Sequence, residues 1–188
     1  MQQTNPYIKP NRNSRMSIGE VYFWTSTIKD WKHLLNQDKY KTLIIDCLKE
    51  LVDKQLIKVY AYVIMPNHIH LVWELLEKNG KEMPHTSFNK KTAHEILKDL
   101  KFNHQYVLPF FSVDEKEREY RIWQRDALAV EMDSKKKVEQ KIDYIHGNPL
   151  HEKWNLAKRP EEYIWSSAKY YEQDEDVFGI LTHYADRF

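Results

Sequence analysis

The chain has 188 residues, of which 41% are hydrophobic and 30% charged, and its formal net charge is +1. These values are typical of one soluble globular domain and exclude a disordered chain. No apolar stretch approaches the roughly 20 residues that cross a bilayer, so we expect no membrane partner. The amino terminus lacks the pattern of a secretion signal, and the single Cys47 cannot form an internal disulfide, which together favour the cytoplasm.

The amino-terminal segment, residues 1–17, is polar and carries Lys9, Arg12 and Arg15 without an acidic residue. We expect it to form a flexible basic arm at the start of one domain that spans 1–188. Such an arm can bind a DNA backbone, although a run of charge is more often only a solvated surface.

The first half of the chain alternates strand-like and helix-like patterns. Residues 21–28 are aromatic and β-branched, which predicts a buried strand. Residues 38–55 repeat apolar positions at helical spacing, and residues 57–64 predict a second strand. The tripeptide Met65-Pro66-Asn67 predicts a turn that pairs this strand with a third one beginning at His68.

The second half predicts a loop over residues 77–87, a helix over 88–106 and a strand within 120–132. Ser134 is a candidate cap for a helix that runs through Ile145, and a last helix is expected from about Pro160 to Tyr171. The order strand, helix, strand, strand, helix, strand predicts an α+β, ferredoxin-like (RRM-like) sandwich. In that fold, helices cover one face of an antiparallel sheet.

Two histidines interrupt the apolar third strand. His68 and His70 face the same side, because side chains alternate along a strand. Two neighbouring neutral imidazoles supply half of a divalent-metal site. One alternative is that both lie on the solvated face of a strand. Another is that the pair serves a metallohydrolase that acts on a different phosphodiester.

The helix after Ser134 carries a candidate partner for the histidines. Residues four apart share a helix face, so a helix that continues to Asn148 would place its amide oxygen beside the Tyr144 phenol. Lys137 and Lys141 align with Tyr144 and are candidates to hold a phosphate backbone. A residue before proline disfavours helical geometry, so Asn148 could instead merely end the helix.

Four short segments occur in order between about residues 20 and 171. They are Pro66-Asn67-His68-Ile69-His70, Ile122-Trp123-Gln124-Arg125, Tyr144-Ile145-His146-Gly147-Asn148-Pro149 and Trp165-Ser166-Ser167. Together they resemble the motifs of REP-associated tyrosine transposases, a branch of the single-tyrosine HUH transposases. The resemblance implies metal-dependent cleavage and strand transfer of single-stranded DNA beside hairpins.

The resemblance also implies roles for individual residues. Tyr144 would be the nucleophile that forms a covalent 5′-phosphotyrosine, and His68, His70 and Asn148 would be ligands of Mg²⁺ or Mn²⁺. A phenol, with an ordinary pKa of about 10, is a poor nucleophile at neutral pH, so the phosphate must be made more electrophilic. Because these ligands carry no charge, we expect weak metal binding until DNA phosphate adds oxygens.

The second motif supplies further DNA-binding candidates. Trp123 and Arg125 could stack on or contact unpaired bases, although Trp123 is equally compatible with a core position. His146 faces about 200° away from Tyr144 on a helix and is a weak candidate for proton transfer. For Trp165-Ser166-Ser167 a structural role is favoured.

The sequence leaves the assembly and the activity open. We expect a monomer or a homodimer, since enzymes similar to this one include dimers that share active sites. The alternative function is a non-catalytic, domesticated protein that binds structured nucleic acid and keeps the basic arm.

Overall fold

The computed structural model describes residues 15–125 and 127–188. Lys9 and Arg12 of the expected arm lie outside the described residues, and Arg15 is exposed. A four-stranded antiparallel sheet forms the centre of the fold, in the order β2-β3-β1-β6. Its strands are β1 (Val21–Thr27), β2 (Ile57–Ile64), β3 (His68–Leu75) and β6 (Leu128–Glu131).

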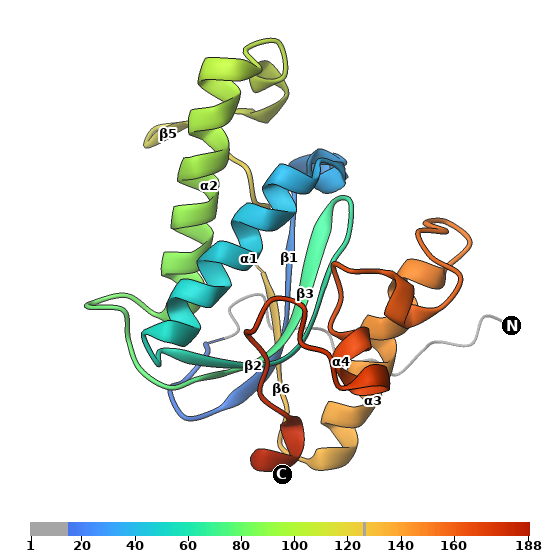
Figure 1. The fold of residues 1–188 in the computed structure, drawn as a ribbon. Helices are drawn as coiled ribbons and strands as arrows, with labels where there is room; N and C mark the ends of the chain where they lie inside the picture. The colour runs from blue at the N-terminus through green and yellow to red at the C-terminus, as the bar shows by residue number, and fades with distance from the viewer. Residues whose placement is uncertain (1–14, 126) are drawn as a thin grey trace, which may run out of the picture.

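Two helices connect these strands in the predicted order and two follow the last strand, and the α+β, ferredoxin-like arrangement is confirmed. The helices are α1 (Asp38–Asp53), α2 (Pro84–Asn103), α3 (Lys135–Gly147) and α4 (Ala168–Gln173). A small hairpin of β4 (Ser112–Glu115) and β5 (Arg118–Tyr120) is inserted between α2 and β6. Figure 1 shows α1 and α2 on one side of the sheet and α3 and α4 on the other.

The alternation of side chains along the strands gives each face of the sheet its own partner. On one face, Trp24 and Trp73 pack against Phe88 of α2. On the other, Phe23 and His70 pack against Tyr144 of α3. The strands are apolar on both faces because both are covered. The helices α1 and α2 form the predicted layer on one face, whereas α3 covers the other face, so the prediction of helices on one face alone is wrong.

Two helix boundaries differ from the prediction. The helix α2 begins at Pro84, inside the predicted loop, because proline fits the first turn of a helix, where no N–H partner is needed. The prediction of one helix from Pro160 to Tyr171 is wrong. A 3-10 turn at Pro160–Glu162 precedes α4, and the backbone between them instead bonds the edge strand β2, with Ile64 donating to the Trp165 carbonyl at 2.9 Å.

The carboxyl end of α1 stores backbone strain. Gln55 has a φ of 56°, while its N–H bonds the Val52 carbonyl at 2.8 Å and the Leu56 N–H bonds the Leu51 carbonyl at 3.0 Å. These two bonds form a Schellman motif, whose left-handed position favours glycine.

Replacing Gln55 with glycine is therefore expected to stabilise the protein by about 1 kcal/mol, because it removes the clash of Cβ with the backbone. Urea unfolding of Gln55→Gly against the wild type measures this gain. Gln55→Ala is the matched control and should lack it, since alanine keeps the Cβ atom. An equal gain in both variants would contradict the explanation.

Candidate active site

The two histidines lie side by side at the beginning of β3, an inner strand of the sheet. His68 and His70 are 7% and 6% exposed, and their ring centroids are 4.6 Å apart. Both face α3, because His70 packs against the Tyr144 ring. The prediction that they share one face of a strand is confirmed, and that face is largely covered rather than solvated.

Each imidazole is oriented by a bond to its Nδ1 atom. His68 Nδ1 lies 2.7 Å from Asn67 Oδ1, and the Asn67 amide nitrogen donates to the Trp31 carbonyl at 3.1 Å. Because the Asn67 oxygen can only accept, His68 Nδ1 must donate, which leaves the lone pair on Nε2. His70 Nδ1 bonds Thr25 Oγ1 at 2.7 Å. Such bonds are how proteins fix metal-binding imidazoles.

Burial keeps both imidazoles neutral. It lowers the pKa of His68 to about 4, with a smaller contribution from the positive charge of Lys153. It lowers the pKa of His70 to about 3, assisted by His68 and Lys141. Both rings are therefore uncharged at neutral pH, which is the protonation state that metal ligation requires.

Tyr144 projects from α3 over the histidines and is 50% exposed. Its ring centroid lies 5.5 Å from that of His70 and 6.0 Å from that of Phe23, in edge contacts. The Lys141 ammonium lies 5.4 Å from the centre of the Tyr144 ring and 4.7 Å from that of Phe23. The structure thus brings a tyrosine, a histidine and a lysine to one exposed edge of the site.

The helical conformation continues through Asn148, at φ −56° and ψ −45°, although Pro149 follows it. The Asn148 amide nitrogen donates to the Tyr144 carbonyl at 2.8 Å. The Asn148 side chain thus contacts Tyr144 through its amide nitrogen and at the backbone. The sequence instead predicts a contact of the amide oxygen with the phenol. Asn148 Oδ1 bonds no other described residue, so the side chain caps the helix and keeps an oxygen available to a ligand.

The donor set limits which metal these residues fit. Within 15–125 and 127–188, no three His, Cys, Asp or Glu side chains form a group that could hold a metal ion. A closed zinc site of nitrogen and sulfur ligands is therefore not supported there. Two oriented neutral imidazoles fit a divalent cation that completes its shell with oxygens from elsewhere, such as those of a substrate.

The other predicted DNA-binding residues lie apart from one another. Lys137 pairs with Asp133 at 2.7 Å on the exposed side of α3. Trp123 is 5% exposed and its indole N–H donates to Thr92 Oγ1 at 2.9 Å. Its ring packs in the core, so it offers no exposed surface for base stacking in this structure.

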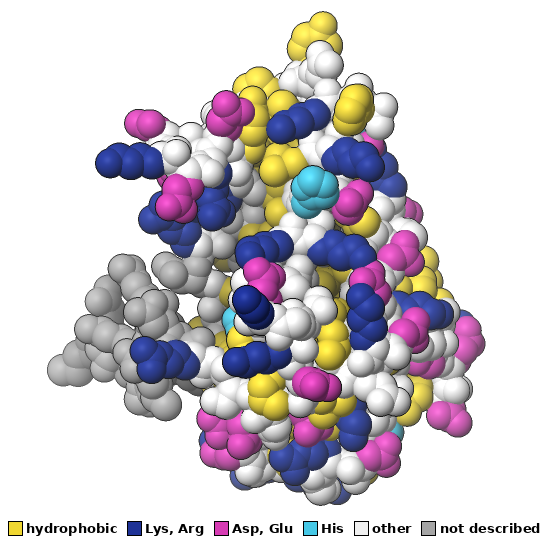
Figure 2. All heavy atoms as spheres, turned by 90° about the vertical axis from the view of Figure 1, so that its left-hand side faces the viewer, with side chains coloured by type: hydrophobic (Ala, Val, Ile, Leu, Met, Phe, Trp, Pro, Cys, Tyr) yellow, Lys and Arg dark blue, Asp and Glu magenta, His cyan; other side chains and the backbone are white. Residues whose placement is uncertain are grey.

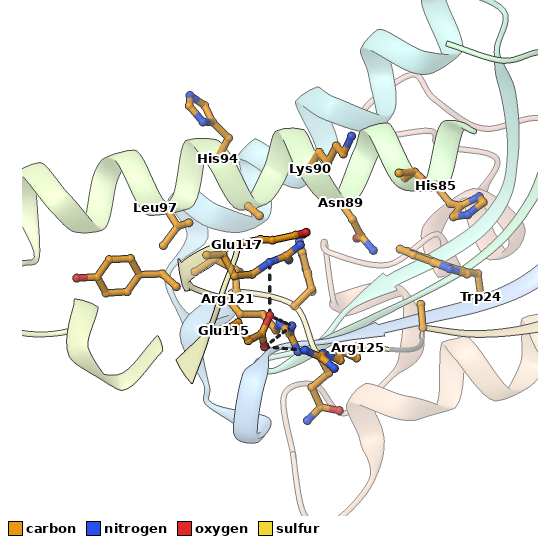
Figure 3. Close-up of a pocket in the computed structure, with 18 of the residues that line it drawn as sticks. Trp24, His85, Asn89, Lys90, His94, Leu97, Glu115, Glu117, Arg121 and Arg125 are labelled. Atoms are coloured by element: carbon orange, nitrogen blue, oxygen red, sulfur yellow. Dashed lines mark hydrogen bonds and ion pairs between the residues drawn. The ribbon is translucent and has the colours of Figure 1, made fainter. Parts of the chain in front are cut away.

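Arg125 lines a groove of about 1190 Å³ between α2 and the β4–β5 hairpin. Figure 3 shows Arg121 and Arg125 converging on Glu115, and Arg118 is the third arginine paired with that carboxylate. Lysines, arginines and carboxylates are mixed over this face of the molecule in Figure 2. Arg125 is exposed, but it belongs to the α2 side of the sheet, opposite the histidines.

His146 and Ser167 form a buried structural contact. His146 Nε2 lies 2.9 Å from Ser167 Oγ, which also accepts a bond from the Tyr62 backbone N–H at 3.0 Å. This contact ties α3 to the edge strand β2 and directs His146 away from Tyr144. It gives Trp165-Ser166-Ser167 its structural role and removes the basis for proton transfer by His146.

Acid is expected to weaken this contact. Burial lowers the pKa of His146 to about 4, so below its ordinary value near 6.5 the unfolded chain binds a proton that the folded chain excludes. Stability therefore falls as the pH drops from about 6.5 to about 4. In His146→Gln that fall should be smaller by about 3 kcal/mol, measured by urea unfolding at several pH values. An unchanged fall would show that His146 is not the source.

Two tryptophans flank His68 and were not identified from the sequence. The ring centroids of Trp31 and Trp154 lie 6.5 Å and 6.0 Å from that of His68. Trp31 follows the strand-like residues 21–28 and Trp154 follows the Tyr144 segment, and neither lies in a recognisable motif. Only folding brings them together at the histidines.

A solved structure of a REP-associated tyrosine transposase bound to a REP hairpin is similar to this chain. The TM-score is 0.60, the sequence identity is 16%, and the match covers 88% of each chain. No family model and no curated protein matches the sequence. No helix among the described residues is long and apolar enough to cross a membrane. At this identity, the likeness shows a shared fold.

Proposed function

We propose that this protein cleaves and rejoins single-stranded DNA beside hairpins, with Tyr144 as the nucleophile. The observation that carries the proposal is the edge contact of a half-exposed tyrosine, at 5.5 Å, with a buried pair of neutral, Nδ1-anchored histidines. The similar solved structure supports the class of substrate, because that protein is bound to a hairpin.

The residues of the site have complementary tasks. His68 and His70 would hold Mg²⁺ or Mn²⁺ through Nε2, with Asn148 Oδ1 as the third ligand. Such an ion, when bound, supplies Lewis-acid polarisation of a phosphate oxygen. Lys141 places positive charge beside Tyr144, where it favours both an incoming phosphate and a developing phenolate.

The bond changes balance without an external energy source. The Tyr144 oxygen attacks phosphorus and loses its proton, the bond from phosphorus to the 3′ oxygen breaks, and that oxygen takes up a proton. The products are a 5′-phosphotyrosine and a free 3′-hydroxyl. Attack by a second 3′-hydroxyl reverses the step and joins two strands, because the phosphotyrosine linkage conserves the energy of the phosphodiester.

Covalent trapping tests this function. The protein is incubated with Mn²⁺ and labelled hairpins, each with single-stranded flanks taken from the genomic surroundings of the gene. We expect a protein–DNA adduct that resists denaturation, with mass spectrometry locating the nucleotide on Tyr144. Tight hairpin binding without an adduct would instead support the domesticated, non-catalytic alternative. Metal-dependent cleavage without an adduct would support a metallohydrolase.

A further inference from the structure

We propose that Trp31 and Trp154 form an aromatic clamp that holds an unpaired DNA base beside His68. This inference rests on the proposed function and identifies a nucleotide subsite of the same site. The two indoles approach the His68 ring with interplanar angles of 71° and 54°. One comes from the segment after β1 and the other from the segment after α3, so the clamp exists only in the folded chain.

Trp31 is 59% exposed, which is unusual for the largest apolar side chain. Its backbone lies in the left-handed region at φ 55°, and the preceding Asp30 has φ 54°. Neither residue is a glycine, so both positions are strained. This strained turn exposes an indole to solvent beside a candidate metal ligand. Strain that is kept at such a place is consistent with a binding role.

Asn67 links this strained turn to the candidate metal site. Its amide nitrogen donates to the Trp31 carbonyl, and its amide oxygen accepts from His68 Nδ1. The Asn67 carbonyl also accepts from the Ile28 N–H at 2.8 Å. One side chain therefore ties the backbone of Trp31 to the His68 imidazole, as expected if both residues contact the same substrate.

Trp154 forms the second side of the clamp and is half-buried. His33 lies against it at 5.6 Å between ring centroids, and the Lys153 ammonium lies 4.9 Å from the centre of its ring. Lys153 is exposed and pairs with no carboxylate among the described residues. Its ammonium is therefore available to bind a phosphate. The exposed Trp31 indole for a base, bordered by Trp154 and with Lys153 for the phosphate, matches the chemistry of a nucleotide.

An unpaired base is the occupant that this arrangement favours. Every base has a π-face, so stacking holds single strands with little sequence preference. A base paired inside a duplex has both faces covered by its neighbours. The clamp would therefore select a single-stranded position and place its phosphate near His68.

The first test measures binding without chemistry. A fluorescent oligothymidylate of about twelve nucleotides is titrated, without metal, into Tyr144→Phe and into the same protein with Trp31→Ala added. We expect at least about five-fold weaker binding with Trp31→Ala and most of the affinity kept with Trp31→Phe. Tyr106→Ala is the matched control, since Tyr106 is 95% exposed at the far end of α2.

The second test locates the base. Single abasic positions are moved along the single-stranded flank of a hairpin that the protein binds. At one position the abasic change should weaken binding to the Tyr144→Phe protein about five-fold and leave binding to the Trp31→Ala protein unchanged. Equal losses in both proteins at every position would overturn the clamp.

The outcomes separate this inference from the proposed function. If Trp31→Ala lowers oligonucleotide affinity but the wild type forms no adduct, the clamp stands and catalysis fails. If adducts form and Trp31→Ala binds as tightly as its parent protein, catalysis stands and the clamp is overturned. Oligonucleotide binding too weak to measure in every variant would also overturn it. Thermal melting shows whether the Trp31 variants are folded.

Discussion

Tyr144→Phe is expected to abolish the covalent adduct and to lower strand cleavage at least about 1,000-fold, because phenylalanine lacks the attacking oxygen. The aromatic ring remains, and with it the edge contacts to His70 and Phe23. Tyr144 is half-exposed and its hydroxyl bonds no other described residue, so folding stability should change by less than about 0.5 kcal/mol. Hairpin affinity should be unchanged.

The measurement is adduct formation on denaturing gels beside a hairpin-binding titration. Tyr106→Phe removes the same atom from a more exposed tyrosine and should keep full activity. An adduct that persists in Tyr144→Phe would show that another residue is the nucleophile. Loss of hairpin affinity in that variant would show that the phenol acts in binding.

The sequence predicted the sheet well because its strands carry a strong local signal. Residues 57–64 and the turn before His68 have the pattern of a buried hairpin, and the structure has that hairpin with the expected boundaries. In α3, the buried residues Val138, Ile142 and Ile145 recur at helical spacing, which is the local pattern of a helix with one apolar side. In these elements, local preference and tertiary packing act in the same direction.

Prediction failed where tertiary contacts decide the conformation. The segment around Trp165 has no local reason to stop being helical, and it does so because its backbone pairs with β2. For Trp123 the sequence is compatible with both DNA contact and a core position, because the partner of its indole N–H, Thr92 of α2, is distant in sequence.

In the candidate site, too, local patterns predicted some features and tertiary contacts decided the others. Alternation along a strand placed His68 and His70 together, and helical spacing related Tyr144 to Asn148. The contact between the two pairs arises only because α3 packs on the histidine face of the sheet. Pattern alone also missed the hydrogen bond by which Asn67 positions His68, since an asparagine after proline is primarily a turn signal.

His70→Ala is expected to abolish Mn²⁺ binding at this site and to lower Mn²⁺-dependent cleavage at least about 100-fold. Only His68 and Asn148 would remain as ligands, and neither carries charge. The variant should stay folded, because the unsatisfied Thr25 hydroxyl costs about 1–3 kcal/mol out of a total stability of about 5–15 kcal/mol. Hairpin affinity without metal should be kept.

The metal itself is followed by the electron paramagnetic resonance signal of free Mn²⁺, in the presence of a hairpin and with Tyr144→Phe as the parent protein. His146→Gln is the matched control: it also replaces a buried histidine, but one that bonds Ser167, so it should bind Mn²⁺ as the parent does. Equal Mn²⁺ binding by His70→Ala and the parent would refute the ligand assignment.

The pH dependence of Mn²⁺ binding gives a second, independent check. Exposed histidines, with pKa values near 6.5, lose metal as the pH falls through 6 because protons compete for the ring nitrogens. Burial holds the pKa of His68 at about 4 and that of His70 at about 3. Mn²⁺ affinity should therefore stay nearly constant from pH 8 to about pH 5 and fall only below that. A midpoint near 6.5 would mean that the metal is held by exposed histidines elsewhere.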